Sequence, residues 1–159
     1  MNAHAELSRK EFLTCRLGDE SYGVDILLVQ EIREVAEVTR VPRVARFVRG
    51  VVNLRGAIVP IVDLGLMFGL PEPIDLKTAS AIVLNVEHRM VGLIVSSVSD
   101  VIALADDEIL PAPELADRAI GAAIAGIGSR RGALASEAES SILLLDVDHI
   151  MRRVREERE

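Results

Sequence analysis

The chain has 159 residues, of which 50% are hydrophobic, and it carries a net charge of −7. A chain of this length buries enough surface to fold as one domain, or as two small fused ones, without a disulfide or a metal. It has no apolar run of transmembrane length, and its polar N-terminus lacks the core of a signal peptide. We therefore expect a cytoplasmic protein without direct membrane insertion. Its charge and four aromatic residues disfavour nucleic acid as a partner.

The first part of the chain predicts a flexible N-terminus (1–10) followed by strands and a capped turn. FLTCRL (12–17) alternates in strand fashion, and the turn GDES separates it from YGV (22–24). The only cysteine, Cys15, lies in this pattern and is interpreted as a packed small hydrophobe rather than a reactive thiol. Asp25 is expected to cap one or two helical turns of ILLVQEI (26–32).

An arginine-rich segment follows, from Arg33 to Arg55. It holds six arginines against two glutamates, a local charge of +4, so the rest of the chain carries −11. Two interpretations stand side by side. The arginines form a solvated face, as scattered surface charges usually do, or they form a docking face for an acidic protein partner.

The segment GVVNLRGAIVPIVDL (50–64) is apolar and strand-like, but Asn53 and Arg55 interrupt it just before Gly56. Arg55 is either a solvated residue at a hairpin bend made by Gly56, or it points at a ligand. Asp63 is expected to cap a short helix in LGLMFG (64–69).

The second half of the chain again consists of short, strand-like apolar runs separated by turn residues. Further strands are predicted over ASAIVLNV (79–86), MVGLIVSSV (90–98) and SILLLDV (141–147), and loops over 71–78, 111–123 and 132–140. Several strands are apolar on both faces, which is typical of strands shared between packed layers or barrels. The segments IVPIVDLGLM (58–67) and SILLLDVDHI (141–150) resemble each other, which indicates either two related β subdomains or a chance likeness between apolar strands.

No pattern of catalytic or metal-ligating residues is present in the sequence. His4, His88 and His149 lie far apart, and a single cysteine excludes a cysteine-based zinc site. GIGSRRG (126–132) does not have the dinucleotide spacing and is interpreted as a hairpin turn. We expect a binding protein without cofactor or metal, and keep a small β-barrel enzyme with a site assembled from distant residues as the alternative.

Across residues 11–151 the sequence resembles the CheW family of chemotaxis coupling proteins. The segments that carry the likeness appear in the family's order and spacing: EFLTCRLGDESYGVDILLVQEI (11–32), VTRVP (38–42), GVVNLRGAIVPIVDL (50–64), VGLIVSSVSDVI (91–102), EILPAP (108–113) and ILLLDV (142–147). One departure is Ser96 with Ser97, where the family often has an aspartate.

The resemblance implies a mainly β fold of two intertwined SH3-like five-stranded β-barrel subdomains with a few short helices. It implies a CheW-like domain over 11–151. Residues 152–159 are expected to form a charged C-terminal tail, and the residues of DHIMRRVREERE (148–159) predict a frayed, charged helix. The resemblance also implies a non-catalytic adaptor that couples transmembrane chemoreceptors to the histidine kinase CheA and is recruited to receptor arrays. A CheW-like scaffold of a related pathway for motility or development is the alternative within the same class.

By matching position, the resemblance implies that Val29, Glu31 and Arg55 face the receptor tip. Thr39 and Gly50 are implied to face the kinase's regulatory domain. Because receptor tips are helical hairpins, we expect an apolar groove that receives a helix face. Val29 would supply apolar area, and Arg55 would donate to a carboxylate or amide. Glu31 would either contact the receptor or hold Arg55 in position.

Overall fold

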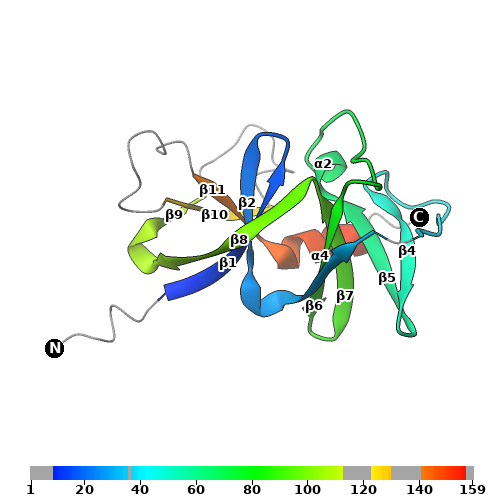
Figure 1. Ribbon diagram of the computed structural model, residues 1–159, viewed down its shortest axis with the longest axis horizontal. Helices are drawn as coiled ribbons and strands as arrows, with labels where there is room; N and C mark the ends of the chain where they lie inside the picture. Colours follow the sequence, from blue (N-terminus) through cyan, green and yellow to red (C-terminus); the bar gives the residue numbers. More distant parts are fainter. Residues whose placement is uncertain (1–8, 36, 113–122, 130–140, 157–159) are drawn as a thin grey trace.

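The computed structural model describes residues 9–35, 37–112, 123–129 and 141–156, which form two sheets and two short α-helices (Figure 1). The first sheet has the strand order β8-β1-β2-β11-β10-β9, and the second has the order β3-β6-β7-β5-β4. The strands are β1 (Arg9–Leu17), β2 (Glu20–Asp25), β3 (Val29–Glu34), β4 (Val48–Leu54), β5 (Ala57–Asp63), β6 (Ser80–Val86), β7 (Arg89–Val95), β8 (Ser97–Ala105), β9 (Ile109–Pro111), β10 (Ile124–Gly128) and β11 (Ile142–Leu145). The helices are α2 (Leu64–Met67) and α4 (Val147–Glu156), with 3-10 turns η1 (Ile26–Leu28) and η2 (Asp106–Glu108).

The chain runs from the first sheet into the second and back again, so the two sheets are intertwined. β1 and β2 belong to the first sheet, β3 to β7 make the second, and β8 to β11 return to the first. Each half of the chain therefore contributes its first hairpin to one sheet and its later strands to the other. The prediction of intertwined β subdomains is confirmed at this level.

Strands that are apolar on both faces lie between two cores. On β6, Ala81 and Val83 pack into a small core within the second sheet, whereas Ile82 and Leu84 pack into a larger core shared by both sheets. On β1, Phe12 similarly belongs to a small core within the first sheet, and its neighbours on the strand belong to the shared core. Each sheet thus encloses apolar side chains of its own and buries its other face against the rest of the molecule, which explains the continuous apolar runs.

The two sheets have the same topology. The order β8-β1-β2-β11-β10 corresponds to β3-β6-β7-β5-β4, and each contains one parallel pair, β2 with β11 and β7 with β5. The similar segments 58–67 and 141–150 form the equivalent units β5-α2 and β11-α4. The sixth strand of the first sheet, β9, corresponds to an isolated bridge between Thr39 and Val51 at the edge of the second.

Both predicted aspartate caps are present. The Asp25 carboxylate accepts a hydrogen bond from Leu27 N at 3.0 Å, and the Asp63 carboxylate accepts one from Leu66 N at 3.0 Å. Of the one or two helical turns expected within 26–32, only the first is present, as the 3-10 turn η1, since the chain enters β3 at Val29. Pairing with β6 provides the backbone hydrogen bonds of this segment. Its side chains alternate between exposed and partly buried, as the side chains of a strand do.

Several predicted boundaries differ from the structure. β1 begins at Arg9, inside the segment expected to be flexible, and the boundary after residue 151 falls within α4. The C-terminal helix is not a separate tail, because Val154 is buried in the shared core. The predicted loop over 71–78 is irregular, whereas the loop over 132–140 and most of 111–123 lie outside the described residues.

The sheets have six and five strands rather than five each, and the pairings of the described strands leave both sheets open between their first and last strands. The mainly β class is therefore confirmed, while closure into SH3-like barrels stays a prediction.

Candidate protein-binding surfaces

Arg55 lies at the tip of the β4–β5 hairpin, in a two-residue turn closed by the pair Leu54 and Ala57. Arg55 has φ +50° and Gly56 has φ +90°, as the hairpin type I′ requires. The Asn53 side-chain oxygen accepts a hydrogen bond from Gly56 N at 2.9 Å, which holds the turn. Asn53 thus has a local structural role. An arginine in the left-handed region is strained, since glycine, asparagine or aspartate are the usual residues there.

The Arg55 guanidinium donates a hydrogen bond to the Glu31 carboxylate and forms an ion pair with it. Arg33 approaches the other Glu31 oxygen at 4.0 Å. Arg55 keeps 64% of its side chain exposed, so most of its donors remain available to a partner. The structure contains the ion pair that the second role expected for Glu31 requires, and the part of either residue in receptor binding stays a prediction.

The two arginines keep Glu31 ionised. The hydrogen bond from Arg55, and then the positive charges of Arg55 and Arg33, lower the pKa of the Glu31 carboxyl, against a smaller opposing effect of desolvation. Glu31 lies after a β-bulge that shifts the register of β3 against β6. Bulges of this kind re-aim side chains next to functional sites.

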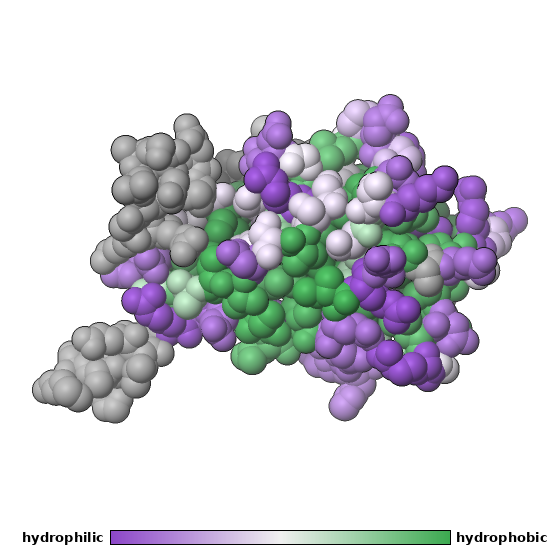
Figure 2. Space-filling view, viewed as in Figure 1, coloured by the Kyte–Doolittle hydropathy of each residue, from purple (hydrophilic) through white to green (hydrophobic). Residues whose placement is uncertain are grey.

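Val29 begins β3 two residues before Glu31 and is partly buried against the shared core. Figure 2 shows apolar side chains gathered on one face of the molecule, over η1, β3 and the neighbouring β1 and β8. The large apolar side chains that these elements expose are Leu27 (85% exposed), Ile32 (46%) and Val101 (47%). Exposed apolar groups of this size on adjacent elements are typical of a protein-binding surface.

Sequence reasoning missed these three exposed residues. Leu27 and Ile32 lie in a segment that was expected to be helical, and Val101 lies in a strand that was only partly predicted. No strand signal was available in this segment, because the two apolar residues of VQEIRE (29–34) lie three positions apart and do not alternate with polar ones.

The structure brings Thr39 and Gly50 close to each other but does not bring either of them to Arg55. The backbone of Thr39 pairs with Val51, with N–O distances of 2.8 and 2.9 Å. Gly50 is buried beneath this bridge at φ +145°, where an added Cβ would meet the Thr39 carbonyl oxygen at 2.3 Å. The close approach at Gly50 is therefore made by another segment of the same chain. The Thr39 side chain is exposed.

A second arginine of the segment has a structural role that the sequence did not reveal. Arg49 donates to the buried Asp63 carboxylate at 2.9 Å and to the Ile74 carbonyl at 2.9 Å. Asp63 also accepts from Ile74 N at 3.0 Å. These contacts tie β4, the start of α2 and the 71–78 loop together, as a buried carboxylate requires.

The described residues offer little for catalysis. They contain no group of three histidine, cysteine or acidic residues able to hold a metal ion. Burial raises the pKa of the Cys15 thiol to about 12, as expected for a packed hydrophobe and not for a nucleophile. Within the same residues, no helix is long and apolar enough to cross a bilayer.

Comparison with known proteins identifies the family. The CheW-like domain family matches residues 11–155, almost the whole chain. This chain belongs to that family. A chemotaxis protein CheW of Klebsiella aerogenes is 40% identical over 142 residues, covering 89% of this chain and 81% of that protein. The chemotaxis protein CheW of Rhizobium meliloti is 35% identical, covering 71% of this chain and 73% of that protein.

A solved CheW structure has the same fold. The scaffolding protein TtCheW of Thermoanaerobacter tengcongensis matches with a TM-score of 0.74 and 29% identity, over 86% of this chain and 88% of that one. The CheW-like domain extends to residue 155 and so includes most of α4, in agreement with the burial of Val154.

Proposed function

We propose that this CheW-like chain is a non-catalytic chemotaxis adaptor that couples the cytoplasmic tips of chemoreceptors to the histidine kinase CheA. Support comes from the family match over residues 11–155, from relatives named as chemotaxis proteins, and from the fold shared with a scaffolding protein. We place it in the cytoplasm, recruited to membrane-associated receptor arrays. Its surfaces fit this role, since the described strands and turns expose large apolar side chains and the Arg55 guanidinium.

The observation that carries the receptor assignment is Arg55, held by Glu31 at a strained hairpin tip. A positioned guanidinium loses less side-chain entropy on binding and offers several fixed donors to a carboxylate or amide. A receptor helix would lay its apolar face on the surface exposed by Leu27, Ile32 and Val101, with Val29 beneath it. The proposed receptor-binding residues are thus Val29, Glu31 and Arg55, together with this apolar face.

We also propose that each sheet curls into an SH3-like barrel. The Glu31–Arg55 pair links β3, at one edge of the second sheet, to the turn of β4 and β5 at the other edge. The Thr39–Val51 bridge attaches the chain that leaves β3 to β4. The small core enclosed by each sheet supports the same curvature.

We propose that the kinase binds at the edge of the second sheet where Thr39 pairs with β4. Thr39 presents its exposed side chain there, and Gly50 supports the surface from below by letting the Thr39 backbone approach. Gly50 would then affect kinase binding through the shape of this edge and not through a contact of its own.

Arg55→Ala tests the receptor assignment. Because truncating an interface arginine removes buried hydrogen bonds, we expect receptor affinity to fall at least about tenfold while the melting temperature barely changes. Arg152→Ala, at an exposed position on α4, is the matched control and should bind the receptor normally. A titration that shows equal receptor affinity for wild type and Arg55→Ala would remove Arg55 from the site.

A pull-down from native cytoplasm and membranes tests the function as a whole. Recovery of a histidine kinase together with a chemoreceptor is expected. The receptor recovered would also distinguish a swimming pathway from a related pathway of motility or development. Turnover of a metabolite without either partner would instead favour the small β-barrel enzyme.

A further inference from the structure

An arginine-rich groove lies on the second sheet. The segment 40–46 forms one wall, the 73–76 part of the following loop with Leu66 of α2 forms the other, and β4 forms the floor. The groove has a volume of about 880 Å³. Its lining combines four arginines with apolar side chains and contains no acidic residue: Arg40, Arg43, Arg46 and Arg49, with Val38, Val41, Val44, Val48, Leu66 and Leu76 among the others.

Only one of these four charges is neutralised by a described residue. Arg49 pairs with the buried Asp63. Arg46 donates to the carbonyl of Pro71 at 3.3 Å, a neutral acceptor that leaves the positive charge uncompensated. Arg40 and Arg43 are exposed and have no ion pair with any described residue. The groove therefore carries a surplus of three positive charges on a chain whose net charge is −7.

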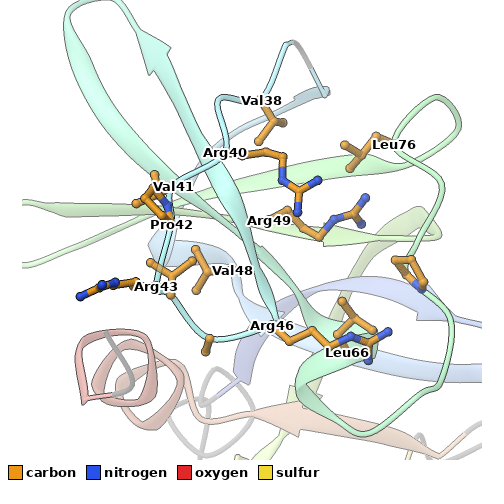
Figure 3. Close-up of a pocket in the computed structure, with 13 residues that line it drawn as sticks. Val38, Arg40, Val41, Pro42, Arg43, Arg46, Val48, Arg49, Leu66 and Leu76 are labelled. Atoms are coloured by element: carbon orange, nitrogen blue, oxygen red, sulfur yellow. The ribbon is translucent and has the colours of Figure 1, made fainter. Parts of the chain in front are cut away.

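The side chains are arranged for a ligand that lies along the groove. Figure 3 shows Arg40 extending across it toward Leu76 and Arg49, Arg46 extending toward Leu66, and Arg43 pointing away. Arg40 and Arg46 thus reach in from the same wall at different points along the groove. Gathering like charges without a counter-charge costs free energy, which an anionic ligand would recover.

We propose that this groove binds an acidic, partly apolar segment of a partner protein in an extended conformation. Charge complementarity favours an anion, and guanidinium groups bind carboxylates through paired hydrogen bonds. The apolar side chains between the arginines favour a peptide over a free ion. In an extended chain, alternate side chains point to opposite sides, so acidic residues can meet the arginines while apolar residues meet the apolar side chains of the groove. The volume is also far greater than a single phosphate needs.

The groove is separate from the Glu31–Arg55 site, since none of Val29, Glu31 and Arg55 lines it. The inference therefore does not depend on the receptor contact proposed above. It resolves the two interpretations of the arginine segment residue by residue. Arg49 is structural, Arg55 lies at the hairpin tip, Arg43 is solvated, and Arg40 and Arg46 bind the partner.

The test uses the full chain and a short labelled peptide with the repeat Glu-Leu-Glu-Ala, followed by fluorescence anisotropy. The control peptide has glutamine in place of each glutamate and should bind at least about tenfold more weakly, because charge-assisted hydrogen bonds are the stronger ones. Arg40→Gln should weaken binding of the acidic peptide by a similar factor. Arg16→Gln, which makes the same charge change on the exposed face of β1, should leave that binding nearly unchanged.

Arg40→Gln should also bind the receptor with wild-type affinity, which separates this groove from the proposed receptor contact. Equal losses for Arg40→Gln and Arg16→Gln would show attraction by net charge and overturn the proposal. So would competition by inorganic phosphate as effective as competition by unlabelled peptide, since the site would then hold a small anion. Concentration-dependent self-association abolished by Arg40→Gln would assign the groove to a second copy of the chain and equally overturn it.

Discussion

The two sheets share one strand topology, yet their edges differ. In both, a glycine lets an additional segment approach: Gly50 beneath Thr39 in the second sheet, and Gly126 beside Leu110 of β9 in the first. Both glycines follow a register shift in the same relative place, in β4 and in β10. The first sheet continues this contact into a three-residue strand, whereas the second has only the Thr39 bridge.

The connections differ more than the strands. β4 and β5 are joined by the two-residue turn of Arg55 and Gly56, whereas the equivalent strands β10 and β11 are joined by residues 129–141. The segment after β3 is rich in arginine, while the equivalent segment after β8 is the acidic turn η2. The shared topology is set by core packing. The two sheets differ at turns and edges, where substitutions leave the cores intact and where the proposed binding residues lie.

The largest expected effect is a difference in stability between variants at Gly50 and at Gly126. Gly50→Asp should cost about 4 kcal/mol or more, because the side chain must fit against the Thr39 carbonyl at positive φ and bury a charge. Gly126→Ala meets the Leu110 carbonyl at 2.8 Å without positive φ, so about 2 kcal/mol is expected. Urea unfolding measures both. A stably folded Gly50→Asp protein that has lost only kinase binding would instead make Gly50 a contact residue.

A second comparison concerns the two aspartates that end β5 and β11. Asp63 is fully buried and binds Arg49, Leu66 and Ile74, so Asp63→Ala should destabilise the fold by about 3 kcal/mol. Among the described residues, the Asp146 carboxylate accepts one hydrogen bond, from His149 N at 3.0 Å, and Asp146→Ala should cost about 1 kcal/mol, as for an ordinary helix cap. Thermal unfolding of the two variants provides the measurement, and equal costs would refute a special role for the Arg49–Asp63 pair.

Two hairpin tips of the second sheet allow a smaller and more informative test. Glu87 and His88 form the same kind of turn as Arg55 and Gly56, with φ +50° and +70°. His88→Gly should therefore stabilise the protein by roughly 0.5–1 kcal/mol through relief of strain. Arg55→Gly relieves similar strain but loses the ion pair with Glu31, so its gain should be smaller and receptor binding should fall. Wild-type receptor affinity in Arg55→Gly would contradict the functional reason for arginine at that tip.

The smallest expected effect is a change in the pKa of the Glu31 carboxyl. Because Arg55 lowers the pKa of Glu31, that pKa should rise toward its ordinary value in Arg55→Ala, as measured by NMR of the side-chain carboxyl. A lowered folded-state pKa means that the stabilisation by the pair is present above the unfolded-state pKa and is lost as the pH falls through the folded-state pKa. The pair is thus intact at neutral pH. An identical Glu31 pKa in both proteins would show that the pair does not persist in solution.

Much of this organisation was predictable from local patterns. Both aspartate caps, the burial of Cys15 and several strands, among them those over 12–17, 58–63 and 79–86, follow from side-chain periodicity and capping chemistry, which act over a few residues. The likeness of segments 58–67 and 141–150 indicated two related units. The receptor-binding roles proposed for Glu31 and Arg55 came only from family resemblance, since residues 24 positions apart give no local signal of a hydrogen bond.

Other features depended on contacts that no local pattern records. ILLVQEI has the composition of a helix, yet pairing of Val29–Glu34 with β6 made most of it a strand. Arg49 looked like its five neighbouring arginines until the fold placed the Asp63 carboxylate beside it.

The sequence by itself determined most of the strands and where the short helices begin, because these depend on interactions between near neighbours. Only the tertiary structure decided that the halves exchange hairpins, that Glu31 meets Arg55, and that Arg40 and Arg46 enter one groove. Those outcomes depend on the packing of distant segments, whose free energy is realised only when both sheets close on their shared core.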